Sequence, residues 1–338
     1  MKAAYYVGNK SFEVRDIAPT PPEADEIQVK IAFSGICGTD LHAYHGDMDK
    51  RIGHNRILGH ETSGTIAALG AGVSGFAIGD PVVVRPLKPC GDCPACRAGF
   101  AHICHNLKFL GLDTDGAFQE LWTVPAYAVH KLPSSLSLQH AALCEPVAVA
   151  CHDVRRGRVK AGEDVLVIGG GPIGMLIAMV ARNEGANVVI SEINDVRLAI
   201  AEQLGFATVN PAKADVVAEI NARTGGKGAD VVFEVSGTTP GAALMTEVAA
   251  TRGRIVMVAI YTKKQEIDLF RFFWRELELI GARVYEPEDF DQAIALIANG
   301  VIDAKTMISE VYPLDQVRQA FQSIDGNARS MKVLLAIS

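Results

Sequence analysis

One short segment constrains the fold of this chain more than any other feature. The sequence DVLVI at residues 164–168 predicts a buried strand, and the apolar segment that begins at Ile173 predicts a helix. Between them, Gly169, Gly171 and Gly174 form the pattern G-x-G-x-x-G. Glycines at these positions let the backbone approach a pyrophosphate, and the helix N-terminus offers it amide donors. The segment therefore predicts a dinucleotide-binding turn, with a purely structural strand-to-helix turn as the alternative.

An acidic residue follows the next predicted strand. Glu192 lies where a carboxylate accepts hydrogen bonds from the hydroxyls of an adenosine ribose. A carboxylate in this position repels a 2′-phosphate, so we expect NAD rather than NADP, although the nearby Arg197 could accept that phosphate. The expected cofactor-binding residues are Gly169, Gly171, Pro172, Ile173, Gly174, Glu192 and Arg197.

The pattern of the chain changes near residue 150. Before this point, short Val, Ile and Ala alternations broken by Gly and Pro predict an irregular β-rich domain. After it, nearly continuous apolar runs such as VVIS and RIVMVAI alternate with helical patterns. That alternation predicts βαβ units and a doubly wound parallel sheet, so the expected class is α/β with two domains.

Charge and hydropathy exclude several classes of partner. The formal net charge is −7, which argues against nucleic acid or an anionic membrane as the main partner. The longest uncharged run, Val165–Ala181, is slightly too short to span a bilayer. No signal-peptide pattern follows Met1, so we expect a cytoplasmic protein.

Four of the seven cysteines lie close together in the segment PCGDCPACRAGFAHIC. Disulfides, an iron–sulfur or redox site, and a closed zinc site are the candidate explanations. Stable disulfides are rare in a reducing cytoplasm, which disfavours the first. The cysteines concerned are Cys90, Cys93, Cys96 and Cys104.

A second group of metal-ligating residue types occurs in the N-terminal half. Thiolate, imidazole and carboxylate are the ligands of a catalytic zinc, which takes three protein ligands and keeps one position open. The candidates lie beside glycine or proline, which places them at turns. They come from the segments GICGTDLH (Cys37, Thr39, Asp40, His42), LGHETSG (His60, Glu61) and LCEPVAVACH (Cys144, Glu145, Cys151, His152).

Taken in order, these segments resemble the zinc-dependent medium-chain alcohol dehydrogenase family over essentially the whole chain. The polyol, butanediol and threonine dehydrogenase branch is the most similar, because Glu145 and Pro146 stand where other branches carry a cysteine ligand. The resemblance implies that Cys37 and His60 bind the catalytic zinc. It implies Glu61 or Glu145 as the third ligand, directly or through bound water.

The resemblance also implies that the four clustered cysteines hold a structural zinc. Bacterial ferredoxins share the spacing C-x2-C-x2-C but continue with a three-residue gap and Cys-Pro, whereas here the gap before Cys104 is seven residues. The spacing therefore favours zinc over an iron–sulfur cluster. We expect Cys144 and Cys151 to be small buried apolar residues.

The implied function is transfer of a hydride from a secondary alcohol to NAD, with zinc polarising the substrate hydroxyl. Thr39 and then His42 would relay the proton, and Glu61 would exchange with water on the metal. The substrate is expected to be a polyol, vicinal diol, sugar acid or threonine-like alcohol. Candidate substrate-lining residues are Tyr44, Phe109, Phe118, Arg283 and Tyr285.

The resemblance further implies a GroES-like catalytic domain, residues 1–147 and 285–338, and a Rossmann-type NAD-binding domain, residues 148–284. A homo-oligomer, dimer or tetramer, is expected. Two alternatives remain. One is a zinc-free NAD(P)H-dependent relative similar to quinone reductases, which lack the four-cysteine segment and the Cys37–His60 pair. The other is a zinc-ribbon-like binding module, which the acidic composition disfavours.

Overall fold

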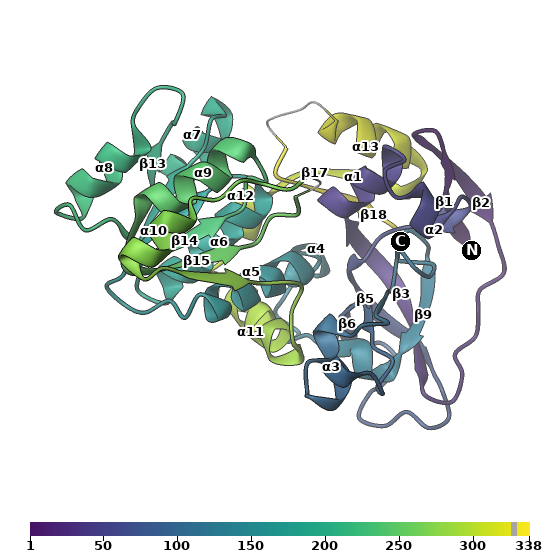
Figure 1. The fold of residues 1–338 in the computed structure, drawn as a ribbon. Coiled ribbons are helices and arrows are strands. Elements are labelled where there is room, and N and C mark those ends of the chain that lie inside the picture. The colour runs from purple at the N-terminus through teal and green to yellow at the C-terminus, as the bar shows by residue number, and fades with distance from the viewer. Residues whose placement is uncertain (262, 326–329) are drawn as a thin grey trace. The chain divides into compact units, whose positions relative to one another are not determined.

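The structure is a computed structural model that describes residues 1–261, 263–325 and 330–338 (Figure 1). The chain forms two compact units. The first combines Met1–Pro146 with Glu286–Ser338, and the second is Val147–Tyr285. Among the described residues, no helix is both long and apolar enough to cross a membrane.

The first unit is built around the long strand β3 (Glu26–Gly35). This strand pairs antiparallel with β5 (Glu61–Leu69), β9 (Leu121–Pro125) and β18 (Lys332–Ala336). The last strand of the chain thus lies inside the sheet of the first unit. The sheet is completed by β6 (Pro81–Val84), β10 (Val129–Lys131) and β17 (Ile308–Pro313), in the order β10-β6-β5-β3-β18-β17.

Smaller elements surround this sheet. β1 (Lys2–Gly8), β2 (Ser11–Asp16) and β4 (Arg56–Ile57) form a three-stranded sheet, and β7 (Leu87–Lys88) pairs with β8 (Lys108–Phe109). The helices are α1 (Gly38–Tyr44), α2 (Asp49–Ile52), α3 (Pro94–Arg97), α4 (Leu138–Ala141), α11 (Pro287–Ala298), α12 (Ala304–Met307) and α13 (Val317–Ile324). Short 3-10 turns span Ala101–Ile103, Ala126–Ala128 and Leu314–Gln316.

An aromatic cluster joins distant parts of the chain in the core of the first unit. Phe321 of α13 lies 4.6 Å from Phe12, 5.1 Å from Tyr44 and 6.2 Å from Phe118 between ring centroids. All four side chains are buried. Because buried aromatic pairs contribute beyond the area they bury, this cluster fixes the C-terminal segment to the N-terminal one.

The second unit contains the expected doubly wound parallel sheet. Its strands are β11 (Asp164–Ile168), β12 (Asn187–Ser191), β13 (Ala207–Val209), β14 (Ala229–Glu234), β15 (Ala249–Met257) and β16 (Glu278–Gly281). Their order is β13-β12-β11-β14-β15-β16, and every pair is parallel. The direction of winding therefore reverses between β11 and β14, the place where ligands bind in such sheets.

Five helices connect these strands, and α5 precedes them. α5 (Cys144–Arg156) begins in the last residues of the first segment of unit one and continues into the second unit. The others are α6 (Pro172–Asn183), α7 (Asp195–Gln203), α8 (Val216–Arg223), α9 (Thr239–Val248) and α10 (Leu269–Arg275).

The glycine pattern forms the turn from β11 into α6. Gly169 adopts a φ of 105°, which disfavours residues with a Cβ. A Cβ on Gly174 would lie 1.9 Å from the carbonyl oxygen of Gly169, so the helix packs directly on the turn. Gly171, in contrast, has a φ of −70°, and the nearest atom to a Cβ there is an Arg197 nitrogen at 3.7 Å.

These two glycines give a matched test of the turn. Gly174→Ala forces backbone atoms apart, at a cost of about 1–3 kcal/mol that outweighs the better helix propensity of alanine. We expect it to lower the Tm of the second unit by about 4–10 °C in calorimetry. Gly171→Ala meets no backbone atom and should leave Tm within about 2 °C of the wild-type value. Equal melting of the two variants would contradict the described packing.

Candidate metal and cofactor sites

Three metal-ligating side chains converge in the first unit. Cys37 precedes α1 as its N-cap residue, and His60 and Glu61 stand at the start of β5. One ligand atom from each of the three lies within 4.8 Å of the other two. His60 and Glu61 are buried, while Cys37 is partly accessible. The group thus has the thiolate, imidazole and carboxylate of a catalytic zinc site, with one side open.

Asp40 contacts both Cys37 and His60. It is buried, and its Oδ2 accepts a hydrogen bond from the amide of Cys37 at 2.9 Å. Its Oδ1 lies 3.6 Å from Nδ1 of His60. Burial lowers the pKa of His60, but Asp40 and Cys37 outweigh burial and hold the pKa well above its usual range. A carboxylate behind a metal-binding histidine orients the ring for its ligand.

Lys332 of β18 is the residue that sequence reasoning missed. It is buried, and its ammonium group donates to Oε1 of Glu61 at 2.5 Å and to the carbonyl oxygen of Ile36 at 3.2 Å. Burial lowers the pKa of Lys332, but the charges of Glu61 and Cys37 raise it further than burial lowers it. A lone cation in the apolar strand KVLLA is the signal that could have revealed a buried acidic partner.

The charges of this group favour a divalent cation. The carboxylates of Asp40 and Glu61 and a thiolate at Cys37 face one ammonium, that of Lys332. With His60 neutral, as a metal ligand must be, two negative charges are then left over in a buried region, where uncompensated charge is costly. A zinc ion supplies two positive charges and prefers these ligands, so the residues fit the metal.

The other residues predicted for this site differ in their exposure to solvent. Thr39 is partly buried, with its Oγ1 3.8 Å from the sulfur of Cys37. His42 is exposed on α1 and faces Asp47 at 3.2 Å. Glu145 is buried on α5 and contributes to the raised pKa of Lys332, yet it is not part of the three-residue group. Cys144 and Cys151 are buried as well.

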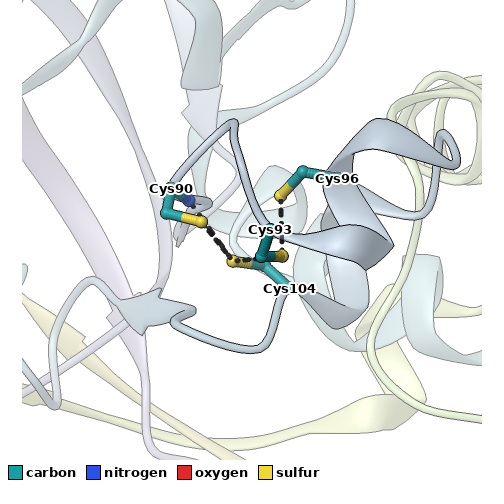
Figure 2. A group of neighbouring side chains, drawn as sticks. All are labelled: Cys90, Cys93, Cys96 and Cys104. Atoms are coloured by element: carbon teal, nitrogen blue, oxygen red, sulfur yellow. Dashed lines mark hydrogen bonds between the residues drawn. The ribbon is translucent and has the colours of Figure 1, made fainter.

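The four clustered cysteines form a second group (Figure 2). Their sulfurs point toward one another around α3, with Cys93–Cys96 at 3.5 Å, Cys93–Cys104 at 3.7 Å and Cys104–Cys90 at 3.5 Å. These distances are too long for disulfides. Four sulfurs bound to one zinc at about 2.3 Å stand about 3.8 Å apart, so the group matches a closed zinc tetrahedron.

Backbone amides donate to the sulfurs of Cys93 and Cys104, whereas burial raises the pKa of Cys96. The amide of His105 donates to Cys93, and the amides of Cys90 and Asn106 donate to Cys104. Donation from the backbone of Cys96, and then of His105, lowers the pKa of Cys93 to about 6. Amide donors stabilise the anionic form that binds a metal.

Four of the seven cofactor residues predicted from the sequence line one cavity in the second unit, whereas Pro172, Ile173 and Gly174 do not. The cavity has a volume of about 800 Å³, and its wall includes Gly169, Gly171, Glu192 and Arg197. Pro172 and Ile173 form the first turn of α6, behind Gly171. The cavity thus lies beside the glycine turn and at the carboxyl end of β11, which fits a dinucleotide.

Glu192 binds nearby backbone amides in the same cavity. Its carboxylate accepts hydrogen bonds from the amides of Gly170, Ile193 and Asn194 at 2.8–2.9 Å. Arg197 lies 3.7 Å from it, and within the described part of the chain the buried Nε of Arg197 has no hydrogen-bond partner. The Nε–H group of Arg197 is therefore an available hydrogen-bond donor beside Glu192, where the ribose of a dinucleotide would be held.

Three of the predicted substrate-lining residues are buried in the structure, and their role stays a prediction. Tyr44 and Phe118 belong to the aromatic core cluster, and Tyr285 is fully buried. Aromatic side chains near turns gain more free energy from core packing than from exposure, which accounts for their burial. Phe109 is partly buried with its ring edge-on to His60 at 5.0 Å, and Arg283 is exposed.

Comparison with known proteins agrees with these observations. Residues 23–134 match the family described as alcohol dehydrogenase GroES-like domain, and residues 172–299 match zinc-binding dehydrogenase. The chain is 55% identical over 335 residues to a 2-dehydro-3-deoxy-L-galactonate 5-dehydrogenase from Pseudoalteromonas atlantica, covering 99% of this chain and 98% of the relative.

Two further comparisons extend this result. An L-galactonate-5-dehydrogenase from Escherichia coli K12 is 33% identical over 89% of this chain and 88% of its own length. A solved structure from Sinorhizobium meliloti 1021, bound to NADP, superposes with a TM-score of 0.93 at 33% identity, covering 99% of each chain. The chain therefore belongs to the zinc-dependent medium-chain alcohol dehydrogenase family.

Proposed function

We propose that this chain is a zinc-dependent dehydrogenase that oxidises a secondary alcohol of a sugar acid with NAD. The observation that carries the proposal is the convergence of Cys37, His60 and Glu61 in one partly open group. The reaction converts the alcohol and oxidised cofactor into a ketone, reduced cofactor and one proton.

The residues of the first unit have distinct tasks in this proposal. Zinc supplies Lewis-acid chemistry that lowers the pKa of a substrate hydroxyl, and nicotinamide supplies the hydride acceptor. Thr39 lies beside Cys37 and accepts the substrate proton, and the exposed His42 passes it to solvent. Lys332 holds Glu61, so Glu61 rather than Glu145 is the third ligand we assign.

The substrate class rests on the relatives. Two of them, at 55% and 33% identity, are named for dehydrogenation at carbon 5 of a galactonate or deoxygalactonate. Others are named as sorbitol and threonine dehydrogenases at 30–38% identity. The higher identity supports a sugar acid over a neutral polyol or an amino acid.

We also propose a homo-oligomer, supported by helix α10 of the second unit. Phe270, Phe273 and Trp274 on this helix are 65%, 77% and 71% exposed and contact one another. A cluster of exposed aromatic side chains on a single helix is typical of a surface that another chain covers.

The substrate prediction is tested by following the reduced cofactor spectroscopically. We expect the wild-type enzyme with NAD to turn over 2-dehydro-3-deoxy-L-galactonate or L-galactonate with kcat/KM at least about tenfold above that for sorbitol or L-threonine. A preference for sorbitol or threonine would refute the sugar-acid assignment. Failure to oxidise any of these alcohols would refute the dehydrogenase assignment itself.

The two metal groups should respond differently to loss of one thiol. Cys93→Ser opens the closed four-sulfur group, so we expect a lower Tm and roughly one zinc per chain in place of two, because a structural metal contributes folding free energy. Cys37→Ser should leave Tm almost unchanged while turnover falls by about 100-fold or more. Calorimetry, metal analysis and kinetics on the same samples distinguish a structural from a catalytic role for each group. A Cys93→Ser enzyme that melts like the wild type would overturn the structural assignment.

Cofactor choice is tested at Glu192. Glu192→Ala removes the acceptor for ribose hydroxyls and should weaken NAD binding by about 1–3 kcal/mol. The same change should improve use of NADP relative to NAD, because no carboxylate then faces the 2′-phosphate. Arg197→Ala, the matched control, should reduce use of NADP more than use of NAD. The measurement is kcat/KM for both cofactors, and nearly equal wild-type values would refute the assignment of NAD.

A further inference from the structure

One ammonium group joins the two chain segments that supply the metal-ligating residues of the first unit. Lys332 donates to the carbonyl oxygen of Ile36, the residue before Cys37, at 3.2 Å. It also donates to Oε1 of Glu61, the residue after His60, at 2.5 Å. The side chain of Lys332 is only 4% exposed, so these contacts are shielded from bulk solvent. The ammonium therefore links the turn after β3 to the start of β5.

The carboxylate of Glu61 is confined between this ammonium and the backbone of β3. Gly35 pairs with Glu61 on one side and with Leu334 of β18 on the other. A Cβ on Gly35 would lie 2.2 Å from Oε2 of Glu61, so the carboxylate lies directly against the strand. Oε2 is also 2.5 Å from Nζ of Lys332, yet within the described residues no directed hydrogen bond reaches it. Oε1 is thus bound to the ammonium, and Oε2 keeps acceptor capacity for a second cation.

Two cations share this carboxylate when a metal is bound. A carboxylate oxygen of Glu61 lies within 4.8 Å of ligand atoms of Cys37 and His60, so all three residues can contribute to one site. The ammonium of Lys332 attracts the same carboxylate and repels a divalent cation placed beside it. The ammonium and the metal therefore compete for Glu61.

We propose that Lys332 is a positioning residue that competes with the metal for the carboxylate of Glu61 and so keeps one position on the metal open for a substrate hydroxyl. Without the ammonium, Glu61 would bind the metal at full negative charge and close the site. With the ammonium present, a substrate hydroxyl displaces a weakened ligand, and the charge of the displaced carboxylate stays balanced. The inference rests on the proposed function, because it requires a metal bound by Cys37, His60 and Glu61.

The first measurement is the rate at which the zinc-loaded protein releases zinc to a chromophoric chelator. Lys332→Met removes the competing charge, so we expect zinc to leave this site about tenfold more slowly than in the wild type. Lys332→Arg keeps the charge and should release zinc within about twofold of the wild-type rate. Cys37→Ser identifies the relevant phase of release, because it removes a ligand from this site and leaves the four-cysteine group intact.

A purely structural lysine predicts the opposite sign for Lys332→Met. Loss of its contacts would loosen the site and speed the release of zinc, and that result would overturn the inference. A double substitution then shows whether Lys332 acts through Glu61. In a Glu61→Gln background the ammonium has no carboxylate to hold, so Lys332→Met should change the rate by less than about threefold. An undiminished effect in that background would contradict the inference, because Lys332 would then act through the total charge of the site.

The second measurement is the Tm of each protein with zinc bound and after zinc removal. Lys332→Met leaves Glu61 as an uncompensated buried charge only in the zinc-free protein, because zinc balances that charge when it is bound. The gap between the two Tm values should therefore widen by about 3–6 °C relative to the wild type. Loss of zinc from the four cysteines affects both proteins alike and cancels in this comparison. Equal lowering of both Tm values, or a zinc-loaded variant that does not fold, would refute the inference.

These measurements separate the inference from the proposed function. A wild-type protein that holds no more zinc than Cys37→Ser has no metal in this site, and that result would overturn both. A protein that binds zinc there but oxidises no alcohol would overturn the proposed function alone, and the zinc-release rates and Tm values would still decide the role of Lys332.

Discussion

Charge cannot be left uncompensated inside an apolar β domain, and this constraint organises the first unit. Glu61, Asp40 and His60 are buried there, and within the described residues the ammonium group that donates to Glu61 is that of Lys332. Because Lys332 lies on β18, the strand must pair with β3 for the charge to be balanced. The sheet, the ion pair and the metal-binding group therefore depend on one another.

Backbone segments form much of the wall of the cavity in the second unit. A Cβ on Gly174 would clash with the backbone, and one on Gly169 or Gly170 would be tightly packed. The turn they form is held by the carboxylate of Glu192 through the amide of Gly170. Glu234 does the same for the loop after β14. Two buried carboxylates, one on each side of the switch point, thus shape a cavity whose walls are otherwise largely apolar.

Local features were predictable from the sequence, and features that join distant segments were not. The strand at 164–168, the glycine turn and the α/β class follow from patterns within about thirty residues. Lys332 was missed because its partner lies 271 residues away, and no local pattern links them. The packing of Tyr44 and Phe118 against Phe321 could not be predicted for the same reason, since Phe321 is distant in the sequence. The roles of the metal and cofactor residues stay predictions.

The position of β18 also sets the order in which the molecule can be completed during synthesis. The second unit is one continuous segment, and all of it is synthesised before the last segment of the first unit, Glu286–Ser338. Until those residues emerge, the sheet of the first unit lacks the strand beside β3, and Glu61 has no ammonium group. The group of Cys37, His60 and Glu61, although it lies in the N-terminal part of the sequence, is therefore among the last parts of the nascent chain to mature.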